Sequence, residues 1–125
     1  MREYLTNSNF YLKIFSVDPD FKAGRLLNLT MENNHAFITL GFPHILPDSA
    51  PINWNKNNFN STKIVISFQF VKNISVANIS LNKTGWFEFN KNTKQYIEVI
   101  FCGDAGNVNI VCEFISIGGI IPYNE

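Results

Sequence analysis

The stretch that decides the fold runs from residue 35 to residue 71 and reads HAFITLGF-PHILPDSAPINW-NKNNFNS-TKIVISFQFV. Both of its ends alternate apolar and polar residues with a period of two, which indicates β-strands with one face in a core. The apolar faces are Ala36, Ile38, Leu40 and Phe42 in the first strand, and Ile64, Ile66, Phe68 and Phe70 in the second. The segment 41–54 between them holds three prolines. Because proline has no N–H for a strand ladder, we expect this segment to form a packed loop.

The same alternation continues on both sides of this stretch. It predicts strands at 27–32, at 74–81 with a break near 77–78, at 86–90, at 96–102, and at 108–117 with its end at Gly118-Gly119. Turns are expected at 33–34, 90–93 and 103–106. Residues 8–15 suit either a short helix capped by Ser8 or Asn9, or an edge strand. The chain of 125 residues is therefore predicted to be one mainly β domain (1–125), an antiparallel sandwich or strongly curled sheet of seven to eight strands with a short N-terminal helix.

Charge is sparse and balanced, with ten basic and ten acidic residues. Nucleic-acid and anionic-membrane binding both call for clustered Lys and Arg, so neither partner is expected. The N-terminus lacks the charged and apolar regions of a signal peptide, and no apolar stretch is as long as a membrane span. We therefore expect a cytoplasmic protein without a cofactor.

The two cysteines, Cys102 and Cys112, fall in separate predicted strands. We expect both to be buried and reduced, as is usual in the cytosol. A disulfide or a metal pair is the alternative, although the chain offers no second cysteine pair for zinc.

Catalytic residue patterns are sparse. His44 lies four residues before Asp48 in the proline segment, without a nucleophile or metal ligand to complete a site. Glu88 and Glu98 are placed to meet across neighbouring strands, as in a hydrolase, but strand carboxylates usually face solvent. We expect no enzyme; a small esterase or hydrolase centred on His44 is the catalytic alternative.

The run from Gly41 to Trp54, with NNFNSTKIVISFQF at 57–70, resembles the bacterial immunity protein 50 family. In that family a strand ending in Phe-Pro leads through further prolines to a tryptophan, and an Asn-containing turn then opens a long alternating strand. The positions that correspond are Phe42, Pro43, Pro47, Pro51, Trp54 and Asn60. Gly85-Trp86 and a closing hairpin formed by 97–106 and 108–123 extend the resemblance downstream. Pro19 and residues 26–29, which correspond to the family's first strand, extend it upstream, so that it covers about residues 19–123.

This resemblance implies a cytoplasmic antidote that binds and blocks a cognate toxin domain delivered by neighbouring cells, without catalysis of its own. Interfaces of this kind rely on aromatic anchors and complementary charges, and toxic nucleases tend to be basic. The partner-binding candidates are therefore the acidic residues Asp18, Asp20, Glu32, Asp48 and Asp104 and the aromatic residues Trp54, Phe59 and Tyr123. Free strand edges also allow a weak homodimer beside the monomer. The rival hypothesis is a carbohydrate-binding β-sandwich that stacks sugars on Trp54 and Trp86.

Overall fold

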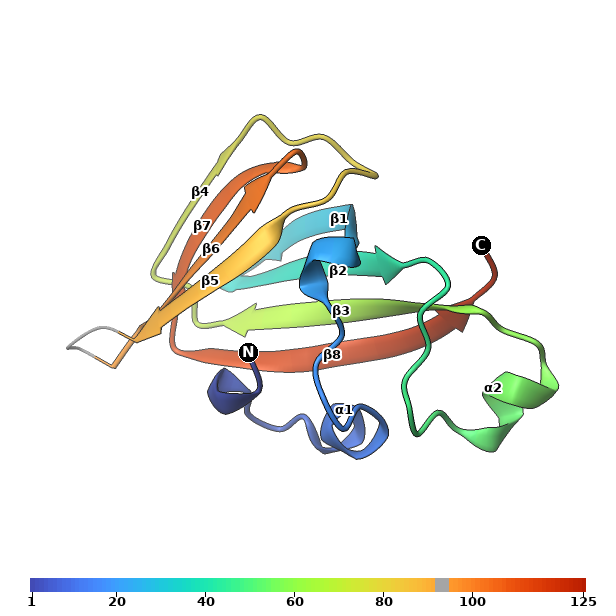
Figure 1. Cartoon of the computed structure of the whole chain (residues 1–125). Helices are drawn as coiled ribbons and strands as arrows, with labels where there is room; N and C mark the ends of the chain where they lie inside the picture. The colour runs from blue at the N-terminus through green and yellow to red at the C-terminus, as the bar shows by residue number, and fades with distance from the viewer. Residues whose placement is uncertain (92–94) are drawn as a thin grey trace.

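The computed structural model describes residues 1–91 and 95–125, which form two four-stranded antiparallel sheets (Figure 1). The first sheet has the order β1-β2-β3-β8 and consists of β1 (Arg25–Glu32), β2 (His35–Phe42), β3 (Ser61–Gln69) and β8 (Phe114–Tyr123). The second has the order β4-β7-β6-β5 and consists of β4 (Asn73–Ala77), β5 (Trp86–Lys91), β6 (Ile97–Gly103) and β7 (Gly106–Cys112). The prediction of a mainly β fold with seven to eight antiparallel strands is confirmed.

The core consists of the facing sides of the two sheets. Alternate residues of β2, β3 and β6 are buried in it, as the period-two pattern predicts: Ala36, Ile38, Leu40, Phe42, Ile64, Ile66, Phe68, Ile97, Val99 and Phe101. Full burial of an Ile or Phe side chain contributes about 1.5 to 3 kcal/mol relative to exposure. The prediction for the inner face of β3 is wrong only at Phe70. This residue follows the end of the strand and is exposed.

The N-terminal segment covers the part of the first sheet that the second sheet leaves open (Figure 1). It contains two 3-10 turns, η1 (Arg2–Tyr4) and η2 (Phe21–Ala23), and the helix α1 (Asn9–Ile14). Ser8 occupies the N-cap position of α1, but its hydroxyl makes no capping hydrogen bond to the helix and instead accepts from the Ile117 amide at 2.9 Å. Of the two predictions for residues 8–15, the helix is therefore confirmed.

The proline-rich segment contains a helix that the sequence analysis did not predict. Residues 43–51 are irregular, but α2 (Ile52–Lys56) follows Pro51 directly. Trp54 is the buried residue of this helix and belongs to the core cluster. With only five residues and one buried side chain, α2 has no apolar periodicity that would reveal it.

The strand predicted at 108–117 is wrong, because two strands in different sheets occupy this stretch. β7 ends at Cys112, and β8 begins at Phe114 and runs through Gly118 and Gly119. At the crossing, the Glu113 amide donates to the Gln69 carbonyl at 3.1 Å, which places this residue beside the end of β3. The chain changes sheets here within the run IVCEFISI at 110–117, where Glu113 is the charged residue and no Gly, Pro, Asn or Asp marks the crossing.

The predicted turns at 33–34 and 103–106 are confirmed by the pairs Glu32–His35 and Gly103–Gly106. The break near 77–78 is also confirmed, because β4 ends at Ala77 and Asn78 has a left-handed φ of 58°. The continuation of this strand to 81 is wrong, because residues 78–81 form no strand. For the turn predicted at 90–93, positions 90 and 91 belong to β5 and the rest lies outside the described residues.

Candidate functional site

The outer side of the second sheet is an open surface. Because inward residues alternate with outward ones, each of its strands presents three side chains away from the core. We call these twelve residues the open face: Asn73, Ser75 and Ala77 of β4, Trp86, Glu88 and Asn90 of β5, Glu98, Ile100 and Cys102 of β6, and Asn107, Asn109 and Val111 of β7. All twelve are exposed or half-buried, so within the described chain no element packs over them.

The strand register arranges the open face in rows across the sheet. One outer row runs Trp86–Cys102–Asn107–Ala77, the middle row Glu88–Ile100–Asn109–Ser75, and the other outer row Asn90–Glu98–Val111–Asn73. Three of the twelve side chains are Trp86 and the two glutamates. The other nine are neutral amides, small residues or apolar groups. A surface that mixes polar and apolar groups and has few large side chains suits contact with another folded protein.

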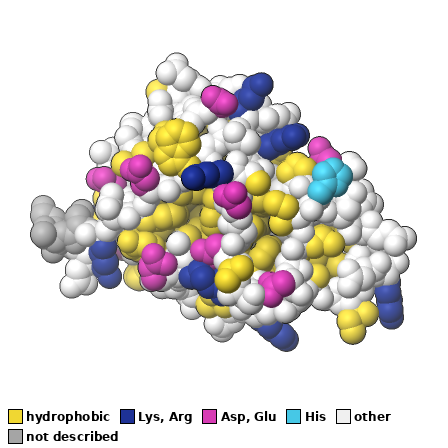
Figure 2. Space-filling view, viewed as in Figure 1, with side chains coloured by type: hydrophobic (Ala, Val, Ile, Leu, Met, Phe, Trp, Pro, Cys, Tyr) yellow, Lys and Arg dark blue, Asp and Glu magenta, His cyan; other side chains and the backbone are white. Residues whose placement is uncertain are grey.

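Glu88 and Glu98 are the charged residues of the open face. Glu88 pairs with Ile100 and Glu98 with Asn90, so the two carboxylates lie diagonally on neighbouring strands, on the same side of the sheet. Both are exposed, and neither has an ion pair with another described residue. Figure 2 shows acidic side chains over the β5 side of the molecule, among apolar ones and some Lys or Arg side chains.

Trp86 lies at the edge of the open face, with 44 % of its surface exposed. Its neighbour Gly103 has a φ of +145°, and a Cβ there would lie 2.7 Å from the Gly85 Cα and 3.3 Å from the indole ring. Glycine at this position therefore lets the end of β6 pass close beneath the ring. A half-exposed tryptophan on rigid backbone is the residue type that most often anchors protein interfaces.

The cysteines differ from their prediction in one respect. Cys112 faces the core, where burial raises the pKa of its thiol to about 12. Cys102 is only half-buried, because it lies on the open face beside Trp86. The register places Cys102 opposite Asn107 and Cys112 opposite Ile97, so the two thiols lie on opposite sides of the sheet and both are free.

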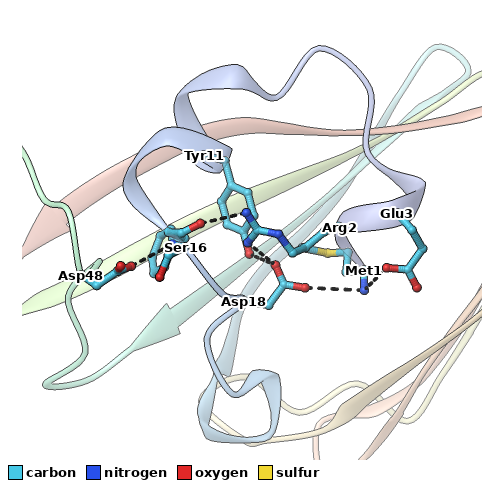
Figure 3. Close-up of polar contacts among 8 residues, drawn as sticks. Met1, Arg2, Glu3, Tyr11, Ser16, Asp18 and Asp48 are labelled. Carbon is cyan, nitrogen blue, oxygen red and sulfur yellow. Dashed lines mark hydrogen bonds and ion pairs between the residues drawn. The ribbon is translucent and has the colours of Figure 1, made fainter.

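Three of the predicted acidic candidates, Asp18, Asp20 and Asp48, form hydrogen bonds within the protein. Asp20 and Asp48 accept from backbone amides. Asp20 caps η2 by accepting from the Lys22 amide at 3.0 Å. Asp48 accepts from the Ser16 amide at 2.9 Å (Figure 3), and hydrogen bonding from the Ser16 side chain and then from this amide lowers the pKa of its carboxyl. In this way Asp48 ties the proline-rich segment to the end of α1.

Asp18 is the centre of a polar cluster that fixes the N-terminal segment (Figure 3). Its carboxylate accepts from the Tyr11 hydroxyl at 2.5 Å and pairs with the Arg2 guanidinium at 3.3 Å and the Met1 amine at 3.5 Å. The same guanidinium donates to the Phe15 carbonyl at 2.9 Å. Burial, and then the bond to Asp18, raise the pKa of Tyr11 above its usual range.

The other two acidic candidates are exposed at hairpins. Glu32 ends β1 in the first sheet. Asp104 lies in the turn between β6 and β7, directly after the row that contains Trp86 and Cys102, and therefore borders the open face. The structure thus does not bring the five acidic candidates together.

The aromatic candidates lie apart from the open face. Trp54 is 7 % exposed in the core, and the half-buried Phe59 donates its amide to the Trp54 carbonyl at 3.2 Å. Tyr123, at the end of β8, lies under the Lys63 ammonium, 5.1 Å from the ring centroid. Because Trp54 is buried, the carbohydrate-binding hypothesis lacks one of its two stacking platforms.

The open face was not predicted as a unit, although part of its signal is present in the sequence. In 86–90 the sequence WFEFN alternates, and the half-buried Phe87 and Phe89 point inward, which leaves Trp86 and Glu88 outward. We considered Glu88 and Glu98 only as a catalytic pair.

In the described chain, the residues considered for catalysis do not come together as a catalytic group. The Asp48 carboxylate bonds to Ser16, and the exposed His44 donates its amide to the Ser61 hydroxyl at 2.9 Å. Among the described residues, no group of three His, Cys, Asp or Glu side chains is placed to hold a metal ion. The described helices are all too short to cross a membrane.

Fold and surface define a two-sheet antiparallel β structure whose second sheet has an open outer face with two glutamates. The chain belongs to the Immunity protein 50 family, whose model matches residues 7–123. This confirms the resemblance found in the sequence and extends it to α1. Members of such immunity families are typically non-enzymatic. Comparison with curated proteins and with solved structures gave no match.

Proposed function

We propose that this protein neutralises a cognate toxin domain by binding it directly and covering a surface that the toxin needs, without catalysis, in the cytoplasm of the producing cell. Membership of the Immunity protein 50 family over residues 7–123 is the observation that carries this proposal. Its name implies a toxin as partner, and tight binding to a folded domain is sufficient for protection.

The open face is the surface that we assign to the toxin. It lies on a rigid sheet rather than on a loop, so little conformational entropy is lost when it binds. It carries the exposed Trp86, with Asp104 at its border. The other acidic and aromatic candidates are either engaged within the chain or lie elsewhere.

Co-expression tests the proposal. The toxin domain encoded beside this gene is expected to stop growth alone, and the wild-type chain is expected to restore growth and to co-purify with the toxin. In vitro, toxin activity should fall linearly with added immunity protein and end at a fixed stoichiometric ratio, because occlusion does not turn over. Failure to restore growth, or protection by strongly substoichiometric protein, contradicts neutralisation by direct binding.

A further inference from the structure

We propose that the open face receives a basic surface of the toxin, with partner Lys or Arg side chains placed against Glu88 and Glu98 and with Trp86 packed beside them. This inference rests on the proposed function and names the chemistry of the partner at that same site.

The two glutamates repel each other in the free protein. Residues at diagonal positions on neighbouring strands lie about 7 to 8 Å apart, which is no more than the screening length of about 8 Å at physiological ionic strength. No basic residue occurs among the twelve residues of the open face. A cation from a partner, placed between the carboxylates, therefore stabilises both at once.

Some acidic residues elsewhere in the described chain contrast with this pair, whereas the exposed Glu32 and Asp104 form no ion pair with a described residue either. Asp18 pairs with Arg2 at 3.3 Å, Glu113 with Lys72 at 3.7 Å, and Glu125 with Arg25 at 3.7 Å. The Glu113–Lys72 pair lies just beyond the last row of the open face, where the Lys72 ammonium is also 5.6 Å from the Tyr96 ring centroid. Lys72 is thus engaged within the chain.

The charge of the face also selects among possible occupants. A second copy of this chain, stacked face to face, would bring four unpaired glutamates into one interface, and like charges oppose such contact. A basic protein surface relieves the repulsion instead. Arginine suits the site best, because its planar guanidinium binds carboxylates in a fork and stacks on indole rings.

Association kinetics test this chemistry. The double variant Glu88→Gln and Glu98→Gln keeps size and polarity but removes both charges. Its association with a catalytically inactive form of the toxin domain encoded beside the gene is expected to be roughly tenfold slower than wild type at low salt. Its affinity should also depend less steeply on salt concentration, as surface plasmon resonance at several salt concentrations would measure.

A charge-matched control is the double variant Glu3→Gln and Glu125→Gln, which alters the net charge equally but lies outside the open face. It is expected to keep the wild-type association rate to within about twofold. Equal rates and equal salt dependence in the two double variants would overturn the basic-partner inference while leaving neutralisation by binding intact. If the wild-type chain itself does not bind the toxin, the proposed function fails, and this inference fails with it.

Discussion

Phe101→Ala is expected to lower the free energy of unfolding by about 3 to 5 kcal/mol. Phe101 is fully buried in β6, and its ring centroid lies 4.8 Å from that of Phe87. A Cβ on Gly85 would lie only 2.7 Å from the same ring, so the backbone packs tightly against Phe101. Truncation leaves a cavity that this close-packed backbone cannot readily fill. Urea denaturation followed by tryptophan fluorescence measures the loss.

Ile100→Ala is the matched control, because Ile100 precedes Phe101 in β6 and points to the open face. This half-buried side chain is expected to contribute no more than about 1 kcal/mol. If the two variants lost equal stability, or if Ile100→Ala lost more, the assignment of inner and outer faces to the second sheet would be wrong. The same pair therefore tests whether the open face points to solvent.

Asp18→Ala is expected to destabilise the fold by about 2 kcal/mol. The substitution leaves the Tyr11 hydroxyl without its acceptor and the Arg2 guanidinium without its carboxylate. Tyr11 is 1 % exposed, so water does not freely replace the lost bond. Chemical denaturation measures the change, and a double-mutant cycle with Tyr11→Phe isolates the coupling between the two side chains.

Glu32→Ala provides the comparison, since Glu32 is exposed on a hairpin and is expected to change stability by less than about 0.5 kcal/mol. An Asp18→Ala variant as stable as Glu32→Ala, with no coupling to Tyr11→Phe, would show that Asp18 is an ordinary surface carboxylate. Asp18 would then again be available as a toxin contact.

The strands were predictable wherever one face is buried, because the period of two is a local signal. The inner faces of β2, β3 and β6 follow it residue by residue. The crossing at Glu113 was not predictable in this way. The chain leaves β7 with Cys112 buried and enters β8 with Ile115 buried, and only this change of phase marks the passage between sheets.

The acidic candidates show why the site was harder to predict than the fold. Asp18 and Asp48 resemble free loop carboxylates in the sequence, but they bond to residues 7 and 32 positions away. Such contacts depend on how α1 and the proline-rich segment pack. Conversely, Glu88 and Glu98 belong to one surface only because β5 and β6 pair in a particular register.

Cys102 lies on the open face and is partly accessible to labelling reagents, whereas Cys112 is buried. N-ethylmaleimide is expected to modify Cys102 in the native protein and to leave Cys112 unmodified, since burial raises the pKa of the Cys112 thiol to about 12. Denatured protein should react at both thiols, which peptide mass spectrometry distinguishes.

The most direct test of toxin binding at the open face is the rate of Cys102 alkylation with and without a saturating amount of the inactive toxin domain. Complex formation is verified separately by gel filtration. If the toxin covers this sheet face, alkylation of Cys102 is largely blocked in the complex and returns when the complex is dissociated. An unchanged rate of Cys102 alkylation in a fully formed complex would contradict the account and place the toxin on another surface.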